Sequence, residues 1–173
     1  MKKELIIGSG SSRDKRLTID GTTEFSNPTF LDYNKDHKPD IIWDLTVLPY
    51  PMWSNEFDEI HAYEVLEHTG QQGDYKFFFG QFSELWRCLK PNGHLMVTCP
   101  SRHSPWALGD PSHTRILQKE MLVFLSQDEY KRQVGVTPMS DFRYIYKADF
   151  EPVYVNETNE TFEFILRAIK ENT

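Results

Sequence analysis

The sequence has few of the features that would stabilise a small secreted domain or anchor a chain in a membrane. It has only two cysteines, Cys88 and Cys99, which fall in a helix-like and a strand-like segment. We therefore expect two reduced core residues of a cytoplasmic protein rather than a disulfide framework. No apolar run approaches the roughly 18 to 20 residues that cross a bilayer. Met1–Glu4 leads directly into the first predicted strand, so we expect no signal peptide.

An excess of basic residues is also missing. The formal net charge is −7 at pH 7, and acidic residues are spread along the chain. Duplex nucleic acid requires a basic face, so we do not expect it as a partner. Because no apolar run is long enough to cross a bilayer, we do not expect a membrane either. The chain does have 39% hydrophobic and 14% aromatic residues among its 173 positions. These values predict one globular domain, residues 1–173, with a substantial core.

Five short apolar runs, each ending at an acid, a glycine or a proline, predict buried parallel strands. Between the last two runs, apolar side chains at helical spacing predict a helix over Asp74–Lys90, which Pro91-Asn92-Gly93 should end. This alternation predicts an α/β fold with a doubly wound, mostly parallel sheet. The five predicted strands are Glu4–Gly8, Thr29–Asp32, Asp40–Leu45, Phe57–Ala62 and His94–Cys99.

Three segments depart from this alternation. Ser11–Pro28 is rich in Ser, Thr, Asp and Gly, so we expect a short helical turn and a loop there. Phe150–Val155 and Thr161–Lys170 are rich in strand-forming residues and predict an antiparallel hairpin. Residues 100–140 form a long insertion with a predicted helix at Lys119–Leu125. Segments of this length in a compact domain usually bind or cover a ligand, so we expect a lid.

The first predicted strand opens into a glycine turn that is typical of nucleotide-binding βαβ units. Gly8-Ser9-Gly10 follows the strand, and Asp32 ends the next one. A rival acid, Asp20, lies too close to Gly10 for a crossover between parallel strands. The turn lacks the third glycine of the dinucleotide fingerprint, which disfavours a nicotinamide-dependent oxidoreductase.

The motifs in this order resemble class I S-adenosylmethionine-dependent methyltransferases, in particular the small single-domain type 11 members. The resemblance covers about residues 4 to 125, and the terminal hairpin agrees with it. It implies a seven-stranded, Rossmann-like sheet that ends in an antiparallel hairpin, with S-adenosylmethionine at the carboxyl ends of the first four strands. The segments that carry the resemblance are LIIGSG, PDIIWDL, FDEIHAYEVLEH, LWRCLKPNGHLMVTCP and GDPSHTR.

The resemblance also implies cofactor contacts. The glycine turn would lie under the methionine part, and Asp32 would accept hydrogen bonds from both ribose hydroxyls. Asp44 would lie near the adenine amine, with Leu45 against the ring. Both acids have an alternative interpretation as turn residues. The implied cofactor-binding residues are Gly8, Ser9, Gly10, Asp32, Asp44, Leu45 and Tyr63.

Three residues after the fourth predicted strand could bind a metal. On a predicted helix Glu64, Glu67 and His68 would share one face. Their spacing is similar to the Glu-x-x-Glu-His site of ubiquinone-pathway and small-RNA 2′-O-methyltransferases, where His113 would add a second imidazole. We expect Mg²⁺, Mn²⁺ or Zn²⁺ there. Two alternatives stay open: the acids stabilise a helix start, or His68 or His113 acts as general base without a metal.

The sequence around the predicted site favours an oxygen as methyl acceptor. Ala62-Tyr63-Glu64-Val65 replaces the proline-rich turn of amino-methylating DNA enzymes, and Cys99 lacks the second cysteine motif of carbon-methylating RNA enzymes. We expect transfer to a small or glycan-like hydroxylated acceptor, largely by alignment of the reactants. A catalytically silent module that binds a partner is the alternative, and the oligomeric state stays open. The candidate acceptor contacts are Arg102, His103, Trp106, His113 and Arg115.

Overall fold

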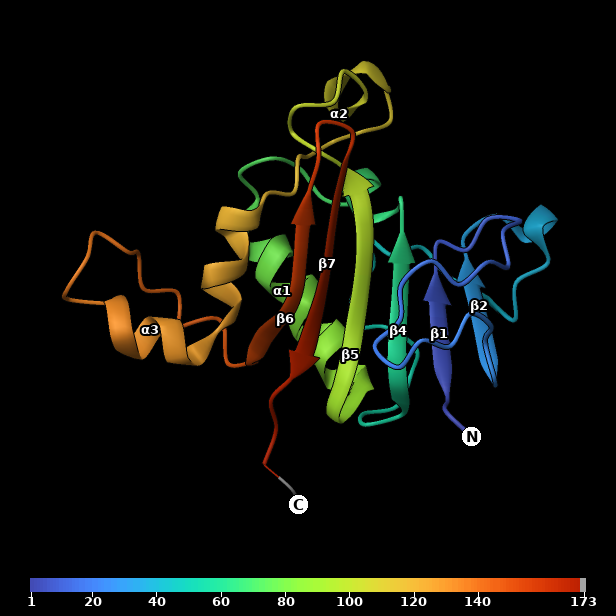
Figure 1. Cartoon of the computed structure of the whole chain (residues 1–173), viewed down its shortest axis with the longest axis horizontal. Coiled ribbons are helices and arrows are strands. Elements are labelled where there is room, and N and C mark those ends of the chain that lie inside the picture. The colour runs from blue at the N-terminus through green and yellow to red at the C-terminus, as the bar shows by residue number, and fades with distance from the viewer. Residues whose placement is uncertain (172–173) are drawn as a thin grey trace.

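Seven strands form one mixed sheet in the computed structural model, which describes residues 1–171 (Figure 1). The strand order is β3-β2-β1-β4-β5-β7-β6. The first five strands pair in parallel, and β7 pairs antiparallel with both β5 and β6. The predicted α/β fold with a mostly parallel sheet and an antiparallel hairpin is therefore confirmed. The bounds are β1 Glu4–Ile7, β2 Pro28–Asp32, β3 Ile41–Ile42, β4 Phe57–Tyr63, β5 Leu89–Pro100, β6 Phe150–Glu157 and β7 Thr161–Ala168.

The central strands β1 and β4 are largely buried and carry both apolar and charged residues. All four residues of β1 are buried, and this strand pairs with β2 on one side and β4 on the other. Ile7 lies opposite Leu31 and opposite Ala62, so the carboxyl ends of three strands meet at the same edge. The chain order reverses beside β1, which is where open α/β sheets offer a ligand crevice.

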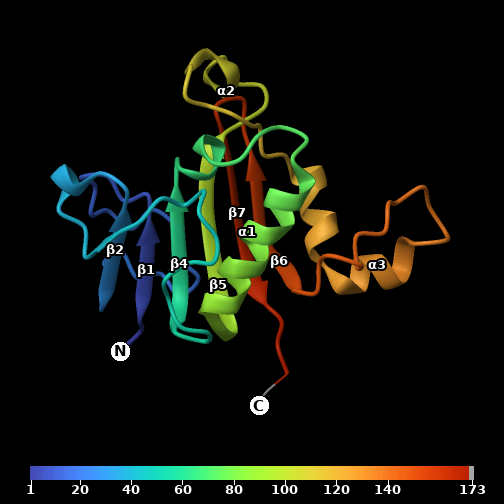
Figure 2. The same ribbon diagram turned by 180° about the vertical axis from the view of Figure 1, so that it is seen from behind.

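One long helix, α1 (Tyr75–Cys88), covers the face of the sheet seen in Figure 2. The Asp74 carboxylate accepts a hydrogen bond from the Phe77 N–H group and so caps the helix. Phe79, Phe82 and Leu85 are buried along one side of it. The predicted helix is confirmed, but Pro91-Asn92-Gly93 lies within β5 rather than in a turn after the helix. The shifted register between β4 and β5 at Phe57–Glu59 accommodates that segment.

Other predicted elements differ from the structure. The third strand is only Ile41–Ile42, because the Asp44 carboxylate accepts two hydrogen bonds from Thr46 and turns the chain. The helix predicted at Lys119–Leu125 does form, as the 3₁₀ helix η3. No helical turn forms in Ser11–Pro28. The remaining helical elements are η1 (Lys35–His37), η2 (Leu66–His68), α2 (Trp106–Gly109) and α3 (Gln127–Gln133).

The Ser11–Pro28 loop lies in front of β1 and β4 (Figure 1) and is attached to them by buried charges. Lys15 Nζ lies 2.8 Å from carboxylate oxygens of both Glu4 and Glu59, and all three side chains are at most 2% exposed. His61 bonds to Glu59 on the same side of the sheet. Burial opposes ionisation of Glu59, but hydrogen bonds from His61, Lys15 and Lys2 hold its pKa well below the usual range. Ion pairs thus replace the apolar helix face that would normally cover these strands.

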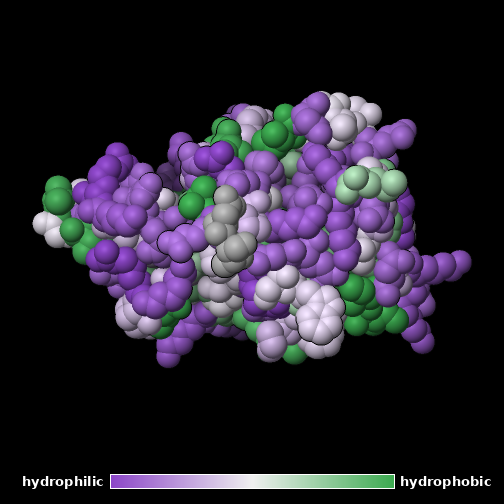
Figure 3. All heavy atoms as spheres, turned by 90° about the horizontal axis from the view of Figure 1, so that it is seen from below, coloured by the Kyte–Doolittle hydropathy of each residue, from purple (hydrophilic) through white to green (hydrophobic). Residues whose placement is uncertain are grey.

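The surface seen in Figure 3 is mainly hydrophilic, as the many charged residues of the sequence predict. Seen from below, most exposed residues are hydrophilic, with hydrophobic residues in separate small groups (Figure 3). Both cysteines are buried and unpaired, as expected. Among residues 1–171, no helix combines the length and the apolar character that crossing a bilayer requires.

Candidate functional site

A cleft of about 500 Å³ opens at the carboxyl ends of β1, β2 and β4. Its volume is within the range of small-molecule sites, about 300–1,000 Å³. Five of the seven predicted cofactor residues line it: Gly8, Gly10, Asp32, Asp44 and Leu45. The cleft also contains residues that were not predicted as cofactor contacts, namely Tyr33, His37, Trp43, Thr46, Glu64, Val65, His68, Thr69 and Ser112.

The two glycines of the turn, Gly8 and Gly10, have different surroundings. Gly8 and Gly10 both have left-handed backbones, with φ of 58° and 52°. A Cβ on Gly8 would lie 2.0 Å from Val65 Cγ2, so only glycine allows the turn to pack against the segment after β4. A Cβ on Gly10 would meet nothing within 4 Å. The backbone at Gly10 is therefore open to a ligand in the cleft.

Replacing Gly8 with alanine is expected to lower the free energy of unfolding by about 2–4 kcal/mol, from left-handed strain and overpacking against Val65. Gly10→Ala carries only the strain and should cost about 1–2 kcal/mol. Urea denaturation of both variants measures the difference. Equal losses would show that contact with Val65 does not limit the residue at position 8.

Asp32 is held in a fixed orientation at the edge of the cleft. Its side chain is buried, with only 4% of the residue exposed. Oδ2 accepts a hydrogen bond from the Gly10 N–H group at 2.7 Å, and Oδ1 accepts one from the Asn34 N–H group at 2.8 Å. A carboxylate has about four acceptor positions, so capacity for further donors remains. The rival Asp20 bonds instead to Lys2 and Thr22 in the Ser11–Pro28 loop and does not line the cleft.

Two predicted cofactor residues lie outside the cleft lining. Ser9 is buried, and its hydroxyl donates to the Gly10 carbonyl oxygen at 3.4 Å. The Tyr63 hydroxyl bonds to His61 Nδ1 at 2.6 Å and accepts a hydrogen bond from the Leu17 N–H group at 3.1 Å. The structure thus places Tyr63 against the Ser11–Pro28 loop, because Tyr63 is two residues after His61 in β4 and faces the same side of the sheet.

Two aromatic residues beside the cleft were missed by the sequence reasoning. Tyr33 follows β2 directly and is 77% exposed. Trp43 follows β3, and its indole N–H group donates to the Val47 carbonyl oxygen at 3.0 Å. Their positions immediately after strand ends were a usable signal, since those ends border the crevice of an open α/β sheet.

The chain after β4 does not form the predicted α-helix. Glu64 has a left-handed backbone with φ of 54°, and only the 3₁₀ turn η2 follows it. Glu64, Glu67 and His68 therefore do not share a helical face, and that prediction was wrong. The Glu64 N–H group donates to the Thr98 carbonyl oxygen, which keeps this residue at the end of β4. Left-handed residues other than glycine are costly and concentrate at functional sites.

Three predicted metal ligands nevertheless converge. Ligand atoms of Glu67, His68 and His113 all lie within 4.8 Å of one another, and Glu64 is not in this group. The Ser112 hydroxyl donates to Asp110 at 2.6 Å, so it accepts a hydrogen bond from His68 Nδ1 at 3.0 Å. His113 Nδ1 donates to the Trp106 carbonyl oxygen at 2.8 Å. With Nδ1 as the donor, the neutral form of each imidazole keeps a lone pair on Nε2.

Glu67 is an unusual buried acid. The residue is 3% exposed, and among residues 1–171 neither carboxylate oxygen has a hydrogen-bond partner. Burial, together with nearby Glu64, raises the pKa of Glu67 to about 8. An unpartnered buried carboxylate is costly, so a proton or a bound cation must accompany it.

The insertion supplies only part of the expected acceptor contacts. Trp106 is exposed in α2, whereas Arg102 is engaged by Gln118 and Glu120. Arg115 is buried, and its Nε donates to the Leu66 carbonyl oxygen behind η2. The insertion contacts the cleft through Ser112. Closure of residues 100–140 as a lid stays a prediction.

Comparison with known proteins identifies the fold. No family model and no curated protein matches the sequence. A solved S-adenosylmethionine-dependent methyltransferase from Methanosarcina mazei matches with a TM-score of 0.56 and 16% identity, over 98% of this chain and 93% of the other. One from Archaeoglobus fulgidus matches with a TM-score of 0.55 and 13% identity, over 96% and 86%. The chain has the class I S-adenosylmethionine-dependent methyltransferase fold.

The N-methyltransferase NodS from Bradyrhizobium japonicum, solved with S-adenosylhomocysteine, has the same fold. It matches with a TM-score of 0.53 and 13% identity, over 98% of this chain and 79% of NodS. At such low identities the similarity concerns the fold, and the same fold can host different activities. The function therefore depends on the side chains of the cleft.

Proposed function

We propose that this protein is an S-adenosylmethionine-dependent methyltransferase that binds the methyl donor in the cleft at the ends of β1, β2 and β4. The observation that carries the proposal is Asp32. Its carboxylate is buried, is held by the glycine turn and borders a cleft of about 500 Å³. Remaining acceptor capacity on both of its oxygens suits a pair of adjacent ribose hydroxyls.

The other cleft residues support this orientation of the donor. The open space above Gly10 would receive the methionine part. Leu45 and Trp43 would contact the adenine ring, since aromatic and aliphatic side chains pack well against flat rings. Asp44 uses Oδ1 for its turn with Thr46, so its second oxygen would accept from the adenine amine.

For the acceptor we propose an oxygen of a small or glycan-like hydroxylated compound. His68 and Ser112 line the same cleft as Asp32, which puts an imidazole beside the expected donor. Methyl transfer needs an aligned nucleophile and removal of its proton. The His68–Glu67–His113 group offers both a basic nitrogen and a buried carboxylate for that purpose.

We further propose that Glu67, His68 and His113 hold a divalent cation. One carboxylate with two imidazole nitrogens suits Mn²⁺ or Zn²⁺ better than Mg²⁺, which prefers oxygen ligands. Ser112 and the Trp106 carbonyl orient the two rings from behind, as outer partners of metal-binding histidines do. A bound cation would polarise an acceptor oxygen and would remove the cost of the unpartnered Glu67 carboxylate.

Calorimetry with S-adenosylhomocysteine tests donor binding. Asp32→Asn keeps the shape but removes the charge, and charge-assisted hydrogen bonds contribute about 1.5–3 kcal/mol. Affinity should therefore fall about ten-fold or more. Asp20→Asn is the matched control and should bind normally. Unchanged affinity in Asp32→Asn, or an equal loss in Asp20→Asn, would contradict the assignment.

A transfer assay tests the activity. The protein is incubated with S-adenosylmethionine labelled in its methyl group and with pools of oligosaccharides and small hydroxylated compounds. We expect label in a methyl ether product. Tight binding of S-adenosylhomocysteine with no transfer to any pool would favour a catalytically silent binding module instead.

A further inference from the structure

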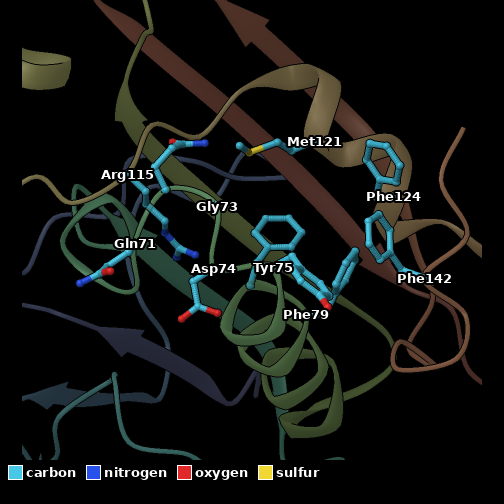
Figure 4. A pocket seen from close by; sticks show the side chains of 11 residues that line it. Gln71, Gly73, Asp74, Tyr75, Phe79, Arg115, Met121, Phe124 and Phe142 are labelled. Carbon is cyan, nitrogen blue, oxygen red and sulfur yellow. The ribbon is translucent and has the colours of Figure 1, made fainter.

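A second cavity, of about 170 Å³, lies beside the start of α1. It has no lining residue in common with the donor cleft. Figure 4 shows aromatic side chains toward one end of this cavity and Arg115, Gln71 and Asp74 toward the other. A cavity of about 150 Å³ is large enough to bind benzene, so this one can accept a single aromatic ring.

The apolar end is formed by rings from separate parts of the chain. Phe142 is at the centre, with ring centroids 5.6 Å from Tyr75, 4.9 Å from Phe79 and 5.7 Å from Phe124. Met121 of η3 adds a flexible side chain. Aromatic rings attract one another at these separations in tilted and edge-on arrangements. A ligand ring would extend an existing aromatic cluster.

The polar end contains a buried cation with unused capacity. Arg115 is 5% exposed. Its Nε donates to the Leu66 carbonyl oxygen, and its Nη2 donates to the Thr69 hydroxyl and the Gln81 amide oxygen. Within the described residues Arg115 forms no direct ion pair and its Nη1 makes no hydrogen bond, while the guanidinium lies 5.8 Å from the centroid of the Phe77 ring. The guanidinium of an arginine is charged at neutral pH.

This end of the cavity carries one basic and one acidic side chain, Arg115 and Asp74. Asp74 is the one carboxylate among the lining residues, and its Oδ1 is committed to the Phe77 N–H group at 3.0 Å. The N-terminus of the 14-residue α1 also lies here and favours negative charge. Glu67 and Asp74 lie close enough to act on Arg115 but neither forms a direct ion pair with it, so a ligand carboxylate at Nη1 would be its first.

We propose that this cavity binds a small carboxylate that carries one aromatic ring. The ring lies among Tyr75, Phe79 and Phe142, and the carboxylate accepts hydrogen bonds from Arg115 Nη1. Arg115 and Thr69 stand between this cavity and the donor cleft, so the ligand is distinct from the methyl acceptor. Binding in this cavity does not depend on methyl transfer.

Titration of the isotopically labelled full chain with phenylacetate, followed by NMR, tests the proposal. We expect binding with a Kd of about 1 mM or tighter and intermolecular contacts from the phenyl protons to Met121 and Phe142. Phenylacetamide has the same shape without the charge and should bind at least ten-fold more weakly. Met121→Trp fills the apolar end and should lose phenylacetate binding at least ten-fold.

A second variant and a second ligand keep the test decisive. Tyr75 is partly exposed, so Tyr75→Ala should fold and still bind phenylacetate several-fold more weakly. Both variants should bind S-adenosylhomocysteine as the wild type does, which separates this cavity from the donor cleft. Equal affinities for the acid and the amide would overturn the proposal. The absence of spectral changes at 10 mM phenylacetate would also overturn it. So would an affinity for phenylacetate that is unchanged in both variants.

Discussion

Titration with Mn²⁺ is expected to show one bound ion per chain, and Glu67→Gln is expected to weaken this binding at least about 100-fold, because loss of even an outer-shell partner costs 10–100-fold. Glu67 is the one carboxylate in the group and is buried without another partner among residues 1–171. The amide keeps its shape but offers no charge to the cation. Electron paramagnetic resonance of free Mn²⁺ measures the bound fraction, and Zn²⁺ should displace the ion.

Glu64→Gln is the matched control for this experiment. Glu64 lies near Glu67 but outside the group of converging ligand atoms, so we expect less than a ten-fold loss. Once an acceptor is known, a chelator should abolish transfer and Mn²⁺ should restore it. A wild-type chain that binds neither Mn²⁺ nor Zn²⁺ would contradict the metal proposal. His68 or His113 would then act as general base, and Glu67 would hold a proton.

The second large expected effect is a loss of stability caused by a mutation in the Ser11–Pro28 loop, which occupies the place of a first helix. Lys15→Met should lower the free energy of unfolding by about 3–5 kcal/mol, because it removes the lysine that pairs with buried Glu4 and one of the two lysines that pair with buried Glu59. Lys15 Nζ contacts Glu4 and Glu59 at 2.8 Å each, and the Lys15 side chain is 1% exposed. Urea denaturation followed by circular dichroism measures the loss.

Lys2→Met serves as the control for Lys15→Met. Lys2 also contacts Glu59, but its side chain is 37% exposed. Partly exposed ion pairs contribute about 0–1 kcal/mol, so we expect a correspondingly small loss. If Lys15→Met loses less than about 1 kcal/mol, water or another group compensates the two acids, and the loop is held by other contacts.

The parts of the fold that were predictable depend on local patterns. The alternation of apolar runs located β1, β4 and α1, since burial on both faces of a strand and on one side of a helix leaves different spacings. Residues between the two strands of the hairpin were polar, which located the turn between β6 and β7. The elements that differed are those where one side chain altered the chain path. The Asp44 side chain turns the chain after β3, and the left-handed backbone at Glu64 is incompatible with a helix that begins there.

The candidate site was predictable only in part for a related reason. Gly8, Gly10 and Asp32 could be placed together because parallel strands bring their carboxyl ends to one edge. Tyr63 could not be assigned a side without the register of β4, and its hydroxyl bonds to His61 and the Ser11–Pro28 loop. Trp43 and Tyr33 border the cleft through the path of short loops, which no periodic pattern describes.

The amino-acid sequence by itself determined the order of the elements, the glycine turn and the acid that faces it, because these follow from spacing along the chain. Only the tertiary structure decided that His113 meets Glu67 and His68, that Lys15 is buried between two acids, and that Arg115 has an unpaired nitrogen beside an aromatic cavity. The physical reason is that spacing governs contacts within an element. Burial and charge pairing between distant segments depend instead on how the loops pack on the sheet.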